Sequence, residues 1–203
     1  MMTGKEKERM LKEAAQWIGY CEKQKCDYSF YDVKAGGAGL NNFTRFGRLA
    51  DIVLYGVDRR VKDGYPWCAM FLLGVLYELK AGKQDCTVGK GQMPVDEAAR
   101  QWVREVVGLG AAIPWHAGCD AWLKAFRHNY RSGRVPHPGD FVVYLDNCGR
   151  AYHIGMVESV QDGGQRFVTI EGNTSAAGDN VVANGGVVAR KIRKNQKCEF
   201  LYC

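Results

Sequence analysis

The sequence predicts an α+β fold in which N-terminal helices pack on a C-terminal antiparallel β-sheet. Up to about residue 128, apolar residues recur at helical spacing, whereas from Pro136 they alternate with polar residues as they do in strands. Helices that precede a run of short strands are typical of an α+β domain. Residues 1–203 contain no repeat and no tract that resembles a linker, so we expect a single domain.

Several helices are predicted in the N-terminal part. The first opens with the capping-box pattern TGKE at Thr3, and its apolar residues continue at helical spacing to Cys21. A second, apolar helix begins near residue 68. Residues 94–107 and 119–128 are amphipathic and form two more helices. The stretch 34–64, which starts with the glycine-rich segment KAGGAGLNNF, is expected to be irregular.

Four strand-like runs follow, in which apolar and polar residues alternate. They are FVVYL, HIGMVESV, RFVTIEGN and GVVARKI, and turn-forming Asp, Asn and Gly residues separate them. Consecutive strands joined by short turns pair as antiparallel hairpins. These runs therefore predict an antiparallel sheet.

The composition indicates a globular protein with a basic surface. Of the 203 residues, 25% are charged, and the net charge is +6. The basic residues are scattered and form no known nucleic-acid module, so we expect no nucleic-acid partner, although the charge suits an anionic cell wall. No apolar run could span a bilayer, and the N-terminus lacks the apolar core of a secretory signal. We expect a monomer that is made in the cytoplasm and has no membrane partner.

Eight cysteines raise the question of disulfides or a metal site. No CxxC pair occurs, and the spacings CEKQKC and CEFLYC have no histidine nearby, so a zinc site is not expected. A domain of this size also needs no disulfide framework. Most of these residues are interpreted as small buried apolar side chains. The eight are Cys21, Cys26, Cys68, Cys86, Cys119, Cys148, Cys198 and Cys203.

Cys68 is the exception, and it is the predicted nucleophile. The segment DGYPWC places a turn and a proline directly before the helix CAMFLLGVLYELKA, which stops at Gly82 and is apolar on nearly every face. Free backbone N–H groups and the positive end of the helix dipole favour a thiolate at such a position. We interpret Cys68 as the only cysteine at a helix start behind a turn.

A predicted hairpin supplies a base and its partners. The turn VQDGGQ joins HIGMVESV to RFVTIEGN, and paired residues of a hairpin have numbers with a constant sum. A sum of 326 places His153 opposite Asn173, and a sum of 324 places it opposite Glu171. Either even sum puts the three side chains on one face of the sheet, whereas an odd sum does not. We expect an even register with an odd-length loop, and a hydrogen bond from the imidazole to Glu171 or Asn173.

The ordered segments PWCAMF, PGDFVVY, HIGMVESV and VTIEGNT resemble the CHAP domain, the cysteine, histidine-dependent amidohydrolases/peptidases. The similarity runs over most of the chain, and WIG, NNFTRFGR and CDAWLKAF resemble members found with phage and gut-bacterial cell-wall enzymes, such as endolysins. The resemblance implies a papain-like fold. It also implies that Cys68 is the nucleophile, His153 the base, Glu171 the group that orients the imidazole, and Asn173 a fourth polar member.

The resemblance further implies a peptidoglycan hydrolase that uses a thioester intermediate and no cofactor. The bond would be the N-acetylmuramoyl-L-alanine amide or one in the stem peptide or cross-bridge. Such an enzyme would reach the wall after release or as part of a larger phage or secreted assembly. Two alternatives stay open: an intracellular amidase that acts on a small glutathione-like conjugate, and a non-catalytic cell-wall-binding module.

Some members of this family hold calcium in an acidic loop before the cysteine. Here that loop contains Asp58 and Asp63 with basic residues between them, which offers too few oxygen ligands, so we expect no metal. The remaining histidines lie in a loop, at a basic helix end and in the turn PHPGD. No catalytic role is assigned to His116, His128 or His137.

Overall fold

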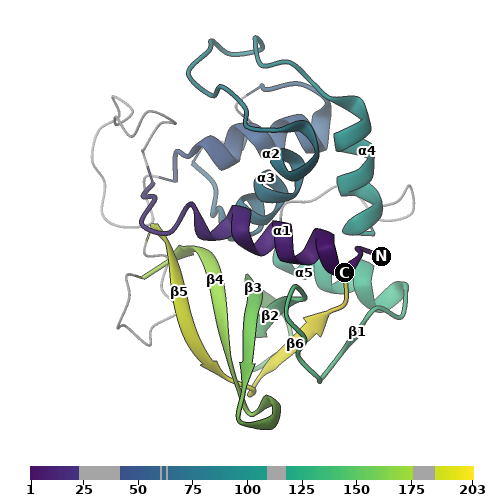
Figure 1. The fold of residues 1–203 in the computed structure, drawn as a ribbon. Helices are drawn as coiled ribbons and strands as arrows, with labels where there is room; N and C mark the ends of the chain where they lie inside the picture. Colours follow the sequence, from purple (N-terminus) through teal and green to yellow (C-terminus); the bar gives the residue numbers. More distant parts are fainter. Residues whose placement is uncertain (23–41, 60, 63, 109–117, 176–185) are drawn as a thin grey trace.

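The computed structural model describes residues 1–22, 42–59, 61–62, 64–108, 118–175 and 186–203 (Figure 1). The described part confirms the α+β class. Its helices are α1 (Gly4–Ala15), α2 (Arg45–Tyr55), α3 (Cys68–Ala81), α4 (Glu97–Val106) and α5 (Cys119–His128). Its strands are β1 (Ser132–Gly133), β2 (Phe141–Leu145), β3 (Ala151–Gln161), β4 (Arg166–Thr174), β5 (Val187–Lys194) and β6 (Cys198–Leu201), with a 3-10 turn η1 (Asp162–Gly164) between β3 and β4.

These strands form one antiparallel sheet in the order β1-β6-β2-β3-β4-β5. Strands β2, β3 and β4 are therefore neighbours in the middle of the sheet. Helices α1 to α4 lie on one side of the sheet in Figure 1, with α1 across the boundary between the two layers. No helix in the described ranges is both long and apolar enough to cross a membrane.

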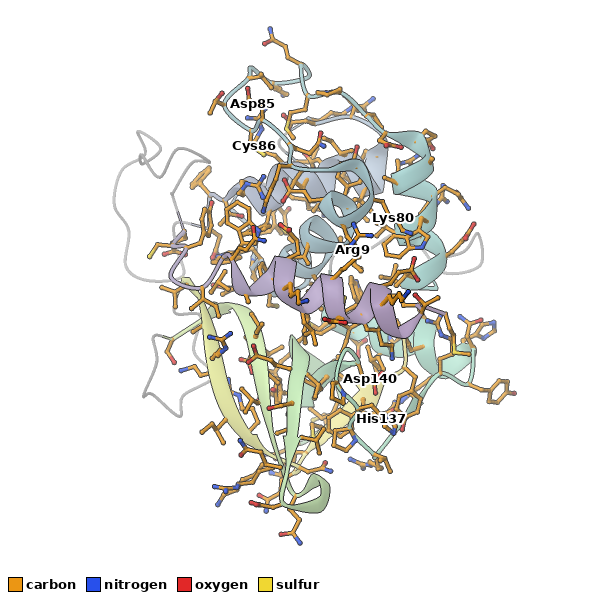
Figure 2. The ribbon with its side chains drawn as sticks, in the orientation of Figure 1. Arg9, Lys80, Asp85, Cys86, His137 and Asp140 are labelled. Carbon is orange, nitrogen blue, oxygen red and sulfur yellow. The ribbon has the colours of Figure 1, made fainter. Side chains whose placement is uncertain are left out.

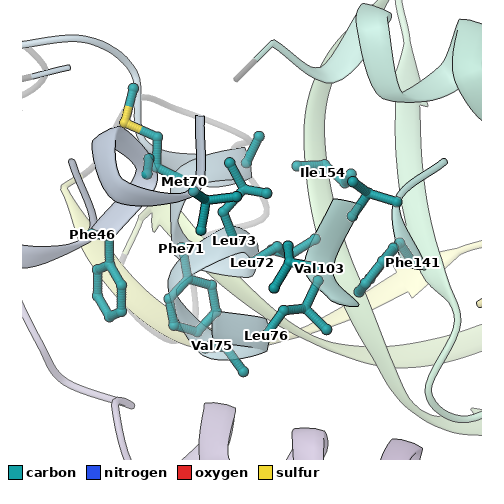
Figure 3. Close-up of a cluster of buried hydrophobic side chains, with 14 of the residues drawn as sticks. Phe46, Met70, Phe71, Leu72, Leu73, Val75, Leu76, Val103, Phe141 and Ile154 are labelled. Carbon is teal, nitrogen blue, oxygen red and sulfur yellow. The ribbon is translucent and has the colours of Figure 1, made fainter. Parts of the chain in front are cut away.

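Helix α3 runs through the hydrophobic core between the other helices and the sheet. Its residues from Cys68 to Glu78 are all buried, which agrees with the predicted apolar helix. Figure 3 shows Phe71 of this helix near Phe46 of α2, and the same cluster includes Phe141 and Ile154 of the sheet. The first turn of α3 is therefore held firmly against the strands that follow it in sequence.

The N-terminal predictions need two corrections. Helix α1 has the expected capping box, but it ends at Ala15 instead of continuing to Cys21. The stretch expected to be irregular contains the helix α2, which Thr44 caps. The sequence pattern does not predict this helix, because its arginines interrupt the apolar face and yet are buried. Arg45 and Arg48 are each about 1% exposed and pair with carboxylates. The glycine-rich segment itself lies largely outside the described residues.

The C-terminal strand β6 is not among the four predicted strands. Four residues carry too little alternation to predict a strand. Pairing with β2 stabilises β6: Phe200 lies opposite Val142, and Phe200 is fully buried. Long-range pairing therefore decides the conformation of this segment.

The β3–β4 hairpin has the expected even register at its inner end, for a different reason than the one predicted. Met156 pairs with Ile170, which corresponds to the sum 326, but Gln161 pairs with Arg166 next to the turn, which corresponds to an odd sum. The loop is thus even in length. A register shift between Val157 and Ser159 restores the even sum beyond it. An irregularity in the strand, and not the loop, sets which side chains share a face.

This register makes Gly155 face Glu171 across the strands. A Cβ atom at Gly155 would lie 2.7 Å from Cγ of Glu171, closer than such atoms approach in proteins. A glycine here therefore leaves the room that the glutamate side chain occupies.

We predict that Gly155→Ala lowers the free energy of unfolding by about 1–3 kcal/mol, because the added methyl group overpacks the sheet against Glu171. Gly4→Ala is the control, since nothing lies within 4 Å of a Cβ there and alanine is the better helix residue. Urea denaturation of both variants measures the difference. Equal stability of the two would contradict the assigned packing.

Candidate active site

Cys68 is the first residue of α3, as predicted, and its side chain is 6% exposed. The N-cap residue of this helix, Trp67, makes no side-chain capping hydrogen bond. Helices α1, α2 and α4 are instead capped by Thr3, Thr44 and Asp96. The first turn of α3 therefore keeps its N–H groups and its positive dipole end available to the sulfur.

His153 lies beside this thiol and shares a hydrogen bond with it. Burial disfavours the imidazolium, but the hydrogen bonds to Cys68 and Glu171 outweigh burial and raise the pKa of His153 to about 9. The pKa of the Cys68 thiol shifts in the opposite direction. A hydrogen bond from Cys119, together with the contact to His153, lowers the pKa of Cys68 well below its usual value, although burial opposes the shift. Both shifts therefore favour the thiolate and the imidazolium over the neutral pair.

Glu171 is fully buried and accepts hydrogen bonds on both oxygens. Nε2 of His153 lies 2.9 Å from Oε2, which leaves Nδ1 as the ring nitrogen that can face the thiol. Arg193 binds the carboxylate with two N–H groups, at 2.9 Å and 2.6 Å. The hydroxyls of Tyr144 and Thr169 donate to Oε1 at 2.8 Å and 2.6 Å. Burial alone would raise the pKa of Glu171, but Arg193 and His153 hold it well below its usual range.

Tyr144 and Arg193 are site residues that the sequence interpretation missed. Tyr144 pairs with His153 across β2 and β3, and the two rings stack with centroids 5.7 Å apart. Arg193 comes from β5, two strands away from His153 in the sheet. A basic residue in a basic strand gives no sequence signal for such a role, because only the sheet order brings it to Glu171.

Cys119 is a second thiol in the site, and its placement corrects the interpretation of Cys68 as the only cysteine at a helix start. Cys119 is the first residue of α5, directly after Gly118, and its Sγ atom lies 3.5 Å from that of Cys68. Asp120 accepts a hydrogen bond from the backbone N–H of Ala151 at 3.4 Å, which ties the start of α5 to the start of β3. The helix predicted over 119–128 contained the signal, because Cys119 stands at its first residue.

Asn173 is buried, at 4% exposure, but its side chain is placed differently from those of the other predicted site residues. Its Oδ1 atom has no hydrogen-bond partner within the described part of the chain. Its φ angle of 54° is left-handed, at a register shift between Glu171 and Thr174. The alternation of faces therefore breaks at this residue. Strand parity places Glu171 beside His153 but does not fix the side chain of Asn173.

A family model described as the CHAP domain matches residues 60–173, which is more than half of the chain. The chain belongs to the CHAP domain family. Family members are typically cysteine- and histidine-dependent amidohydrolases or peptidases, associated with peptidoglycan. The five described helices and six-stranded antiparallel sheet agree with the papain-like fold of a CHAP domain. Neither the curated proteins nor the solved structures compared with the chain include a match.

The acidic loop before Cys68 does not offer the ligands of a calcium site in its described part. Asp58 is buried, and its Oδ2 atom accepts two hydrogen bonds from the guanidinium of Arg48, at 2.5 Å and 2.8 Å. That carboxylate already balances one cation, so it is not free to bind another. Asp63 lies outside the described residues. Among the described ranges, no group of three or more His, Cys, Asp or Glu side chains could hold a metal ion.

The other histidines of this CHAP domain lie apart from Cys68 and His153 or outside the described residues. His128 is the last residue of α5, at the basic helix end that the sequence predicts. His137 bonds Asp140 through Nδ1 at 3.0 Å, and Figure 2 shows both side chains together below α1. His116 lies outside the described residues.

We predict that iodoacetamide alkylates Cys68 at a rate that changes little between about pH 6 and pH 8, because the hydrogen bond from Cys119 and the contact with His153 lower the pKa of Cys68 well below its usual value. Alkylation of the exposed Cys148 in the same samples is the internal control for the reagent. Mass spectrometry of tryptic peptides separates the two sites. His153→Ala should give Cys68 a rising profile. A steep profile at Cys68 in the unchanged protein would rule out the ion pair.

A second prediction concerns Glu171, for which Glu171→Gln removes the charge and keeps the shape. Hydrolysis of purified peptidoglycan should slow about a hundredfold or more, because the imidazolium loses its carboxylate. Stability should fall by about 3–5 kcal/mol, because the buried Arg193 loses its partner.

The double variant Glu171→Gln with Arg193→Met separates these effects. It should recover stability in urea denaturation but not the hydrolysis rate, since no buried charge is left unpaired while the imidazole still lacks its partner. Asn173→Ala should slow the reaction less than Glu171→Gln does. Recovery of rate together with stability would make the role of Glu171 purely structural.

Proposed function

We propose that this chain is a peptidoglycan hydrolase that cleaves an amide bond through a thioester on Cys68. The observation that carries the proposal is the continuous chain of contacts from Cys68 through His153 to Glu171. A nucleophile, a base in contact with it and a carboxylate that orients the base are the parts that acyl transfer requires. Membership of the CHAP family supports the same class of reaction.

In the proposed reaction the Cys68 thiolate attacks the amide carbonyl. The resulting oxyanion is stabilised by backbone N–H groups at the start of α3, including that of Cys68 itself. Tyr65, which is 55% exposed just before this helix, is the candidate for a second donor. The His153 imidazolium then gives its proton to the departing amine, and the neutral ring activates the water that hydrolyses the thioester. Glu171 fixes the orientation of the ring throughout and stabilises it whenever it is charged.

Arg193 has a defined part in this proposal. A buried glutamate beside a histidine would otherwise be partly protonated, and a neutral carboxyl group stabilises the imidazolium poorly. The bidentate guanidinium keeps Glu171 ionised and also fixes the plane of its carboxylate. Arg193 is therefore a positioning residue that acts through Glu171.

The substrate is proposed from the family and from the charge of the chain. A net charge of +6 favours approach to an anionic cell wall. The proposed bonds are the N-acetylmuramoyl-L-alanine amide or one in the stem peptide or cross-bridge. Release into the wall, or delivery within a larger phage or secreted assembly, would bring the enzyme to this substrate. The complete Cys68–His153–Glu171 arrangement speaks against a binding module without activity.

We predict that Cys68→Ala abolishes release of soluble fragments from purified peptidoglycan and leaves the fold intact, whereas Cys148→Ala, at an exposed position, retains full activity. Mass spectrometry of the fragments identifies the bond that is cut. Turnover of a soluble glutathione-like amide without any fragment release would favour the small-conjugate amidase instead. Fragment release by well-folded Cys68→Ala protein would reject the nucleophile.

The pH dependence of the same reaction follows from His153. Its imidazolium is present below a pKa of about 9, and the leaving amine needs that proton. The rate at low substrate should therefore fall as the pH rises through about 9, and the fall should move to lower pH in Glu171→Gln.

A further inference from the structure

The proposed hydrolysis does not need the thiol of Cys119 as a reactant. This thiol nevertheless lies in contact with the nucleophile, Cys68. The two Sγ atoms are 3.5 Å apart, and both side chains are nearly buried, at 6% and 7% exposure. A disulfide needs the sulfurs to approach to about 2.05 Å. The two atoms already lie side by side, so a small movement of the two side chains could close the remaining gap.

The helices make this pair of thiols unusual within the described part of the chain. Cys68 and Cys119 each occupy the first residue of a helix, α3 and α5, and neither helix has a side-chain capping hydrogen bond. Two helix N-termini therefore point their positive ends at the same two sulfurs. This environment favours thiolates, which are the forms that react with oxidants.

We propose that Cys68 and Cys119 form an oxidation site that hydrogen peroxide converts to a reversible disulfide, with Cys119 as the resolving thiol. The Cys68 thiolate attacks a peroxide oxygen: an S–O bond forms, the O–O bond breaks, and the released hydroxide takes the proton of the His153 imidazolium to give water. Cys68 becomes a sulfenic acid, oxidised by two electrons, and the peroxide is reduced.

Cys119 then attacks the sulfur of that sulfenic acid. An S–S bond forms, the S–O bond breaks, and the departing hydroxide leaves as water with the proton of the Cys119 thiol. The sum is two thiols and one peroxide converted to one disulfide and two waters. A dithiol such as dithiothreitol reverses the change and is itself oxidised. Without a resolving thiol, the sulfenic acid would proceed to a sulfinic acid, which dithiols do not reduce.

The electrostatics set the order of these steps. In the reduced state, the hydrogen bond to Cys68, together with burial, raises the pKa of Cys119 well above its usual value. Cys119 is then a thiol that donates to the Cys68 thiolate, and Cys68 is the first to react. Once Cys68 is a neutral sulfenic acid, the negative charge beside Cys119 is gone. The second thiol then becomes easier to ionise at the moment when it is needed.

The test uses the full chain, treated with hydrogen peroxide in small excess. Trypsin releases Cys68 in the peptide 63–80 and Cys119 in the peptide 105–124, and each peptide contains one cysteine. A cross-link between these peptides therefore identifies the disulfide without ambiguity. This readout needs no hydrolysis, so it stands or fails independently of the proposed function, and the activity of each sample is compared with its own untreated value.

We expect the unchanged protein to form this cross-link, to lose at least about nine-tenths of its activity, and to recover that activity in dithiothreitol. Cys119→Ser keeps a hydroxyl donor beside Cys68 but cannot form the disulfide. It should instead give a dimedone adduct at Cys68 when dimedone is added, and sulfinic acid at Cys68 when it is not, so that dithiothreitol does not repair the lost activity. Cys148→Ser, the control at an exposed cysteine, should behave like the unchanged protein.

Two results would overturn the proposal. One is sulfinic acid at Cys68 without a cross-link in the unchanged protein. The other is equal recovery in dithiothreitol with and without Cys119, because the second thiol would then contribute nothing to reversibility.

Discussion

The ion pair between Glu171 and Arg193 is the interaction on which the site depends. A fully buried carboxylate would be too costly if it were unpaired, and here a bidentate guanidinium and two hydroxyl groups satisfy it. One oxygen also accepts a hydrogen bond from His153. The imidazole therefore stands in a fixed orientation beside a fixed negative charge. The cross-strand glycine, Gly155, leaves the space in which this carboxylate lies.

Helix α3 and strand β4 pack closely against each other next to the site. A Cβ atom at Gly172 would lie 2.5 Å from Cβ of Phe71, so the strand backbone packs directly on the first turns of the helix. That approach brings the start of α3, where Cys68 lies, close to His153 of the neighbouring strand β3. The buried aromatic cluster around Phe46 and Phe71 holds α3 in this position. Core packing, which has no chemistry of its own, therefore sets the distance between nucleophile and base.

Local sequence signals predicted the residues that carry the proposed chemistry, and failed where distant segments decide the structure. Cys68 at a helix start could be predicted from a turn, a proline and an apolar run, and His153 beside Glu171 from strand parity. The parity held because a strand irregularity offset an even-length loop, which no local signal indicated. Arg193 and the contact between Cys68 and Cys119 depend on sheet order and on helix packing. Helix α2 could not be predicted because its arginines are buried, and charged residues in a sequence indicate an exposed position unless their partners are known.

The site is a row of alternating charges: the Cys68 thiolate, the His153 imidazolium, the Glu171 carboxylate and the Arg193 guanidinium. Each charge lowers the cost of burying the next, so the row is stable only as a whole. Within the described residues the row ends at the sulfur, beside the first turns of α3 and α5, neither of which has a side-chain capping hydrogen bond. A thiol whose pKa is lowered in this way is ionised to a larger extent, and the thiolate is the form that attacks an amide and the form that reacts with an oxidant. The second thiol lies at that end, where it donates a hydrogen bond to the sulfur while the sulfur is charged.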